Sequence, residues 1–283
     1  MSLIANLAVL TYPEISEFAL GPIDVGGFAL GIRWYSLAYI AGIMFGWWYI
    51  RRLASKPGAA MGVKHIDDFI TWAIVGVIAG GRLGYVLFYR PENYLDDPLA
   101  IFRLWDGGMS FHGGAIGVIL AVIFFSRKHK LELMRVADIV AVVSPVGLFA
   151  GRIANFINGE LWGRTTDVPW AMVFPTGGPL PRHPSQLYEA MGEGLILFLI
   201  LMFLYHKTRL AKEMPGVIAG TFYLGYGLTR VLVEFVREPD VGVEHIMGLT
   251  RGQLLSVPMF LFAAWLISKG LRYRAAQQAK MKK

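Results

Sequence analysis

Seven apolar runs, each close to the length that crosses a lipid bilayer, constrain this chain more than any other feature. A spanning helix takes about 20 residues, and only helices or closed barrels satisfy their backbone hydrogen bonds inside lipid. The runs show no polar alternation, which favours helices over strands. The sequence therefore predicts an all-α polytopic membrane protein with one integral membrane domain over residues 1–283. Its seven transmembrane helices are expected near residues 31–50, 68–89, 109–126, 136–157, 188–205, 216–236 and 253–271.

The composition agrees with membrane spans. Hydrophobic residues make up 55% of the chain and charged residues 17%, and the mean hydropathy is +0.50, which is unlike a soluble domain. The chain has no cysteine, so disulfides, thiolate metal sites and a thiol nucleophile of its own are excluded. The apolar segment 3–10 has neither a basic leader nor a small-residue cleavage site, and we expect it to stay at the membrane surface.

The distribution of charge sets the expected orientation. With the N-terminus outside, the inner connectors and the C-terminal end hold 17 Lys and Arg against five acidic residues, and the outer segments hold 10 against 15. The positive-inside rule then predicts an outer N-terminus, an inner C-terminus and a basic inner tail at 272–283. This bias accounts for the net charge of +7 without a nucleic-acid partner. The longer outer connectors, 90–108 and 158–187, are expected to form an arm or head on the outer side.

Three arginines are expected at one depth in the membrane. Arg82, Arg152 and Arg230 each follow the inner end of a predicted helix by 14 residues, about two-thirds of the way across. A charge inside the bilayer costs about 2.5 to 3.5 kcal/mol even on the lenient insertion scale, so each arginine should face a partner or a wet cavity. The arginine fork of donors suits phosphate, which predicts a site for a lipid phosphate group.

Ion pairing offers a second interpretation of the same arginines. Arg230 and Glu234 are four residues apart on one helix, and Glu189 and Glu193 are four apart on another. Pairs at this spacing share a helix face and can form local or interhelical ion pairs that only hold the bundle together. Residue spacing alone leaves the phosphate site and the structural ion pairs both open.

Other polar residues mark the outer ends of the predicted helices. His112 is followed by glycines that allow a ligand or another backbone to approach closely, although helix packing uses glycine in the same way. Tyr35 lies beside Trp34, where an aromatic belt is expected, and His183 precedes a predicted helix that it could cap. The sequence has no His-Glu-x-x-His pattern and no phosphate loop, so we expect a reaction without metal, nucleotide or other cofactor.

Five segments of the sequence together resemble one family, the phosphatidylglycerol:prolipoprotein diacylglyceryl transferases of the bacterial inner membrane. The resemblance extends from about Trp34 to Pro258 and implies the same seven-helix plan, with a periplasmic N-terminus, a cytoplasmic C-terminus and an active site on the periplasmic side. The first 25 residues and the basic tail depart from the family pattern. The segments are GGRLGYVLFY (80–89), FRLWDGGMSFHGG (102–114), GRIANFINGELWGR (151–164), RHPSQLYE (182–189) and LTRVLVEFVREPD (228–240).

The resemblance also implies an activity and a set of site residues. The family moves the diacylglyceryl group of phosphatidylglycerol to the thiol of a lipobox cysteine in a prolipoprotein signal peptide, which forms a thioether and releases glycerol phosphate. This reaction is the first step of bacterial lipoprotein maturation. The implied catalytic residues are Tyr35, His112, Arg152, Arg230 and Glu234. The residues implied to bind phosphatidylglycerol are Arg82, Arg152, Asn155, Glu160, Gly163, Arg230 and Arg237.

The chemistry of such a transfer agrees with these residue types. A thiol with a pKa of about 8.5 is mostly protonated at neutral pH, so a positioned base helps the sulfur to attack. Arg152 and Arg230 would stabilise the negative charge on the departing phosphate. The proton acceptor is left open between His112 and a carboxylate such as Glu234.

Two other classes of protein compete with the transferase. A transporter or flippase of an anionic lipid could use the same arginines, but such proteins often carry inverted repeats, and this sequence has none that stands out. A seven-helix receptor or structural protein would use the arginines for packing alone, which leaves the polar outer segments unexplained. We therefore favour the enzyme.

Overall fold

The computed structural model describes residues 10–13, 15–26, 28–55, 58–88, 91–95, 97–239 and 248–282. Two compact units divide the chain: Met1–Gly46 with Val140–Lys283, and Trp47–Ile139. Whether they form one integral domain stays a prediction. In the described residues, five helical segments are long and apolar enough to cross a membrane, which supports a polytopic helical membrane protein. They are Val63–Phe88, Phe111–Lys128, Leu133–Ile157, Ser185–Lys207 and Gly252–Met281.

The predicted first and sixth spans are also helical. Helix α1 covers Trp34–Ala54 with 21 residues, and α9 covers Val217–Glu234 with 18 residues. Both helices contain charged residues near one end, and these residues lower the mean hydropathy of the helices. They include Arg51 in α1 and Arg230 in α9. The apolar segment expected at the membrane surface lies outside the described residues, except for Leu10.

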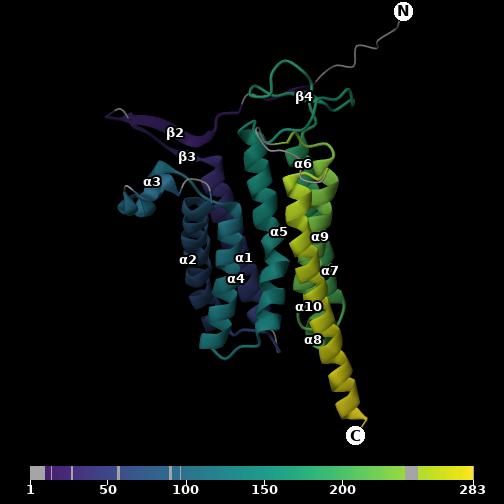
Figure 1. The fold of residues 1–283 in the computed structure, drawn as a ribbon. Helices are drawn as coiled ribbons and strands as arrows, with labels where there is room; N and C mark the ends of the chain where they lie inside the picture. Colours follow the sequence, from purple (N-terminus) through teal and green to yellow (C-terminus); the bar gives the residue numbers. More distant parts are fainter. Residues whose placement is uncertain are drawn as a thin grey trace, which may run out of the picture. The chain divides into compact units, whose positions relative to one another are not determined.

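Glycines set the packing of the unit Trp47–Ile139. Helices α2 (Val63–Phe88) and α4 (Phe111–Lys128) lie side by side (Figure 1). A Cβ added at Gly84 would lie 2.7 Å from Gly113 Cα, and one at Gly76 would lie 2.6 Å from the Gly117 carbonyl oxygen. Only glycine allows two helices to approach this closely. The connector between them contains α3 (Glu92–Leu95), η1 (Pro98–Phe102) and η2 (Leu104–Asp106).

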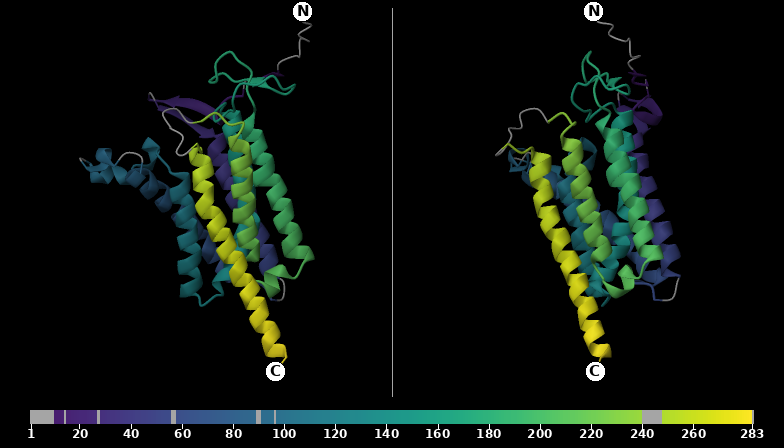
Figure 2. Two further views of the ribbon diagram at one scale, coloured as in Figure 1. Left: turned by 45° about the vertical axis from the view of Figure 1, so that its right-hand side comes forward. Right: turned by 90° about the vertical axis from the view of Figure 1, so that its right-hand side faces the viewer.

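The other unit is a bundle around α5 (Leu133–Ile157) and α9. Helix α6 (Ser185–Glu189) continues through a π-helical stretch, η3 (Ala190–Ile196), into α7 (Leu197–Lys207), and the short α8 (Leu210–Glu213) follows. Helix α10 (Arg251–Met281) runs beside α9 in both views of Figure 2. At their contact, a Cβ on Gly220 would lie 3.0 Å from the Ala263 carbonyl oxygen.

Helix α10 extends past its predicted end. It begins with a capping box between Thr250 and Gln253 and continues to Met281, ten residues beyond the expected boundary at 271. Hydropathy marks only the apolar part of a helix, whereas the alanines and glutamines of 275–279 are exposed and favour helix as well. The predicted basic tail is therefore helical through residue 281.

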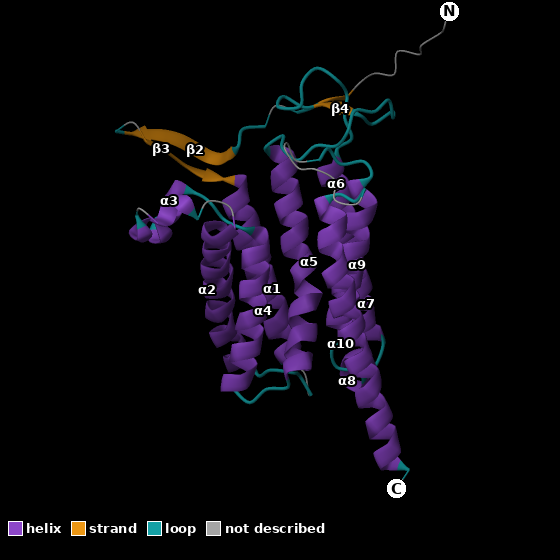
Figure 3. Ribbon diagram, viewed as in Figure 1, coloured by secondary structure: helices purple, strands orange, loops and turns teal. Residues whose placement is uncertain are grey.

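Short strands accompany the helices, so the all-α prediction holds for the long segments only. Strands β2 (Phe18–Val25) and β3 (Phe28–Arg33) form an antiparallel hairpin, drawn in orange in Figure 3. Strand β1 (Leu10–Thr11) pairs in parallel with β4 (Met172–Val173). Pairing of β1 with β4 joins segments far apart in the sequence, which a local hydropathy pattern cannot predict.

Candidate active site

Two arginines and three glutamates form a continuous chain of ion pairs in the helical bundle of Val140–Lys283. Arg152 of α5 contacts Glu193 through Nε and contacts Glu189 through Nη1 at 3.0 Å. The other oxygen of Glu189 lies 2.9 Å from Nη1 of Arg230, on α9. The same Arg230 nitrogen lies 2.9 Å from Glu234. We call these five residues the arginine–glutamate cluster.

The cluster is buried. The side chains of Glu189 and Glu193 are fully buried, and those of Arg152 and Arg230 are 16% and 15% exposed. Ionised groups removed from water need charged partners, and the alternation of signs along the cluster supplies them. The ion pairs expected under the second interpretation of the sequence are therefore present. With every group ionised, the cluster carries one more negative than positive charge.

The π-helical stretch and its glycines bring the glutamates to the arginines. Glu189 is the last residue of α6, and Glu193 lies inside η3. A Cβ added at Gly194 would lie 2.7 Å from the Cβ of Phe149 on α5, so η3 can lie this close to α5 only with glycine there. Single π-helical turns are frequent at functional sites. The sequence predicts both glutamates as ion-pair partners and not as site residues, although two carboxylates in an apolar run are a usable signal.

The start of α10 covers one end of the cluster. A Cβ added at Gly252 would lie 2.6 Å from Oε2 of Glu234 and 2.9 Å from Nη2 of Arg230. The backbone of α10 thus lies directly over the Arg230–Glu234 pair, and a side chain at residue 252 would have to displace one of these two side chains.

Three further predicted residues meet at the end of α5. Tyr35 Oη donates a hydrogen bond to Oε1 of Glu160 at 2.7 Å, and the amide of Asn155 donates to the same oxygen at 2.9 Å. The Asn155 amide also donates to Tyr35 Oη. Gln186 donates to the backbone oxygen of Glu160 at 2.6 Å. Because Asn155 follows Arg152 by one helical turn, this Tyr35–Asn155–Glu160 group adjoins the arginine–glutamate cluster.

Gly163 and Arg237 lie where two backbone segments cross. The two residues form an antiparallel bridge, and the Gly163 amide donates to the His183 carbonyl oxygen at 2.8 Å. A Cβ at Gly163 would lie 2.6 Å from that of His183. Gly163 therefore permits a close backbone approach, and Arg237 is buried beside it. Burial lowers the pKa of His183, since it disfavours the charged ring.

Arg82 and His112 belong to the unit Trp47–Ile139. The Arg82 side chain is buried, and its guanidinium donates to backbone carbonyl oxygens of the connector at 100–108. His112 is exposed in the first turn of α4, and its ring meets that of Phe111 edge-on. Ser110 caps this helix by accepting a hydrogen bond from the Gly113 amide at 3.1 Å.

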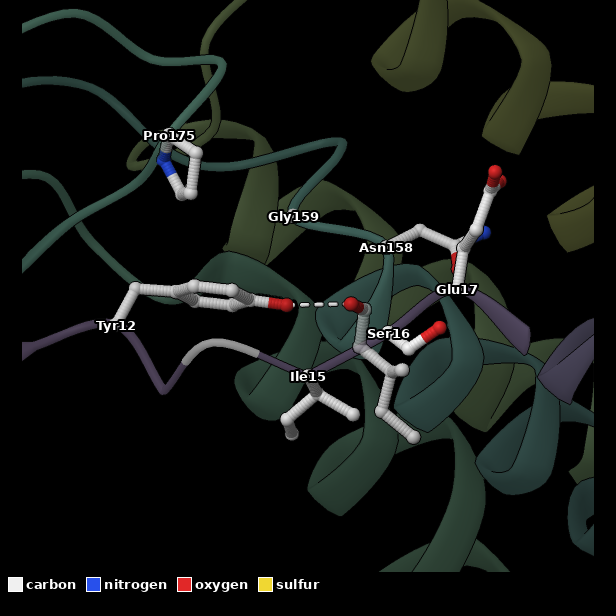
Figure 4. A pocket seen from close by; sticks show the side chains of 8 residues that line it. Tyr12, Ile15, Ser16, Glu17, Asn158, Gly159 and Pro175 are labelled. Carbon is white, nitrogen blue, oxygen red and sulfur yellow. Dashed lines mark hydrogen bonds between the residues drawn. The ribbon is translucent and has the colours of Figure 1, made fainter. Parts of the chain in front are cut away.

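A pocket of about 450 Å³ opens at the C-terminal end of α5 rather than at the arginines (Figure 4). Tyr12 lies on its wall and donates to the carbonyl oxygens of Phe156 and Ile157 at 2.7 and 2.5 Å. These bonds satisfy carbonyls that a helix end leaves without partners. Among the residues that the structure describes, no group of three or more His, Asp or Glu side chains could hold a metal ion.

The helices and the buried arginine–glutamate cluster define a polytopic membrane protein with a charged site inside its helical bundle. Residues 23–269 match the model of a family described as prolipoprotein diacylglyceryl transferase. The chain belongs to this family.

The similarity to known proteins extends over nearly the whole chain. A phosphatidylglycerol--prolipoprotein diacylglyceryl transferase of Rhodospirillum rubrum is 54% identical over 90% of this chain and 92% of its own. The protein of that name from Paramagnetospirillum magneticum is 53% identical over 95% and 98%. That from Allorhizobium ampelinum is 50% identical over 98% of both chains.

Proposed function

We propose that this protein transfers the diacylglyceryl group of phosphatidylglycerol to the lipobox cysteine of prolipoproteins, the first step of bacterial lipoprotein maturation. The observation that carries the proposal is the near full-length identity with transferases of that name. The sulfur forms a bond to the glycerol carbon, the bond from that carbon to the phosphate oxygen breaks, and the thiol loses its proton. The products are a thioether and glycerol phosphate.

The proposed setting is the bacterial inner membrane. Seven spans, a periplasmic N-terminus and a cytoplasmic C-terminus agree with the charge bias of the connectors. The seven long helical segments of the described chain support this number of spans. The active site then faces the periplasm, where the connectors 90–108 and 158–187 form the arm or head.

Arg152 and Arg230 are proposed to bind the phosphate of phosphatidylglycerol. A guanidinium has five N–H donors. The contacts described above occupy Nε and Nη1 of Arg152 and Nη1 of Arg230, so both retain donors for an anion. Their common partner Glu189 holds them close enough to act on one phosphate. A phosphate monoester gains negative charge as it leaves, and preorganised donors stabilise that charge in a water-poor site.

The remaining residues are proposed to position the head group or to move the proton. Tyr35, Asn155 and Glu160 form one hydrogen-bonded group, which suits orientation of a polar head group. Gly163 and Arg237 fix the adjoining backbone crossing. His112 and Glu234 stay the two candidates for the base that accepts the thiol proton.

One assay tests the proposed function. Purified protein is incubated with phosphatidylglycerol and a lipobox peptide, and mass spectrometry is used to look for the diacylglyceryl thioether and free glycerol phosphate. A peptide with serine in place of cysteine should give no thioether. If folded protein forms no product but moves phosphatidylglycerol between leaflets of a vesicle, the flippase is correct and the transferase is wrong.

A pair of variants tests the phosphate-binding role. Arg152→Ala removes donors and leaves Glu189 and Glu193 without one partner, so transfer should fall by about 100-fold or more. Arg209→Ala is the matched control, because its side chain is 87% exposed in a loose ion pair with Glu213 at 3.9 Å. Full activity in Arg152→Ala would contradict the role.

A further inference from the structure

Arg82 is the centre of a hydrogen-bonded loop that precedes His112. Its Nε donates to the carbonyl oxygen of Ile101 at 2.9 Å, and Nη2 donates to those of Ala100 and Arg103 at 2.7 and 3.0 Å. Its Nη1 donates to the carbonyl oxygens of Gly107 and Gly108, the latter at 3.1 Å. These contacts link α2 to the whole connector from residue 100 to residue 108.

The five contacts occupy the whole guanidinium fork. A guanidinium has five N–H donors, and each of the five carbonyl oxygens accepts one. Arg82 is 4% exposed, and the centre of the Tyr94 ring lies 5.4 Å from the central carbon of its guanidinium. A phosphate could bind Arg82 only by displacing carbonyl oxygens of the connector, which would then lose these donors. This geometry disfavours the phosphatidylglycerol-binding role expected for Arg82 from the sequence and favours a structural role in the connector.

The backbone conformation of the connector directs its carbonyl oxygens to Arg82. Gly107 and Gly108 have φ of 77° and 83°, a left-handed conformation that glycine adopts without strain. In this conformation both of their carbonyl oxygens turn to the same Arg82 nitrogen. A Cβ at Gly108 would lie 2.5 Å from the Tyr85 ring, so α2 also confines the connector from that side.

The end of the connector is tied to α2 and begins α4. The Ser110 amide donates to the Gly81 carbonyl oxygen at 2.8 Å, and the Ser110 side chain caps the helix. Close packing of Gly113 on Gly84 then fixes the rotation of α4 against α2. His112 lies between Ser110 and Gly113, so its direction depends on the same contacts.

We propose that Arg82 is a positioning residue for His112: its five hydrogen bonds hold the connector that sets the start of α4. The inference rests on the proposed function, in which His112 takes part in the transfer. Lysine cannot replace Arg82, because one ammonium nitrogen has three donors and cannot reach carbonyl oxygens spread over nine residues.

The test is a double-mutant cycle with Arg82→Lys and His112→Gln, in which kcat and KM for phosphatidylglycerol are measured. We expect Arg82→Lys to lower kcat by roughly 10- to 100-fold and to leave KM within about twofold, since a misplaced group affects the reaction more than binding. In the His112→Gln background, Arg82→Lys should cost less than about twofold in kcat. Arg135→Lys is the control, because Arg135 is in the same unit and makes one long hydrogen bond, 3.5 Å to the Gly58 carbonyl oxygen.

A second variant keeps the test independent of the folding of Arg82→Lys. Gly108→Ala strains the same loop against Tyr85, so it should lower kcat. In the His112→Gln background, the same substitution should leave kcat nearly unchanged. Equal losses of kcat in both backgrounds, or a raised KM at unchanged kcat, would overturn the inference. If His112→Gln alone keeps full activity, the role of His112 in the proposed function fails as well. Absence of product from the unmodified protein would instead refute the transferase itself.

Discussion

Glu189 and Arg230 form an ion pair of 2.9 Å between α6 and α9, and the second oxygen of the same carboxylate contacts Arg152 on α5 at 3.0 Å. One buried carboxylate thus joins the two arginines that the sequence places at equal depth. This bridge holds two like charges together. Under the proposed function, a phosphate that enters the site would meet both guanidinium groups and share them with Glu189.

Replacement of the bridging carboxylate should destabilise the protein. Glu189→Ala leaves Arg152 and Arg230 with fewer negative partners, and removal of one partner from a buried ion pair costs about 3 to 5 kcal/mol. We expect a lower free energy of unfolding in detergent and a loss of transfer activity. Glu213→Ala is the control, because Glu213 makes loose pairs at 3.9 and 3.5 Å with exposed arginines, and such pairs contribute about 0 to 1 kcal/mol. Similar unfolding transitions for the two variants would show that the bridge contributes little.

Two glycine substitutions should differ in their effect on the cluster. Gly252→Ala places a methyl group 2.6 Å from Glu234 Oε2, so α10 or the ion pair must move, and transfer should fall by roughly tenfold or more. For Gly151→Ala, no described atom lies within 4 Å of the added Cβ. Alanine there should stabilise α5 by up to about 1 kcal/mol and keep activity. The measurements are the transfer rate and the thermal midpoint of each variant. Equal activity in both would show that the start of α10 does not confine the site.

The sequence predicts part of the site because helical spacing is local. The depth count places Arg152 and Arg230 together, and both contact Glu189. For Arg82 the depth count does not predict the hydrogen-bond partners. They are backbone carbonyl oxygens of a loop, and the path of this loop depends on tertiary packing. The π-helical stretch around Glu193 is likewise invisible in a hydropathy pattern, since π and α turns differ in backbone hydrogen bonding rather than composition.

His183, at the backbone crossing, should make stability depend on pH. Burial lowers the pKa of His183 below its usual value of about 6.5. Between this lowered pKa and pH 6.5, the unfolded chain therefore binds more protons than the folded protein. This contribution to stability is present above pH 6.5 and is lost as the pH falls through that value. The test compares thermal midpoints between pH 8 and pH 5 for the unmodified protein and His183→Gln. The variant should lose less stability on acidification, and identical pH profiles would contradict the assignment.

The hydroxyl group of Tyr35 should matter more than that of another tyrosine on the same helix. Tyr35→Phe removes the donor at 2.7 Å from Glu160 and leaves that carboxylate oxygen with the Asn155 amide. A hydrogen bond to a charged group contributes about 1.5 to 3 kcal/mol, so both the free energy of unfolding and the transfer rate should fall. Tyr39→Phe is the matched control, because Tyr39 is one turn further along α1 and 58% exposed. If Tyr35 orients the lipid head group through Glu160, its loss should raise KM for phosphatidylglycerol as well as lower kcat. A variant with normal KM and kcat but lower stability would limit Tyr35 to holding α1 and α5 together.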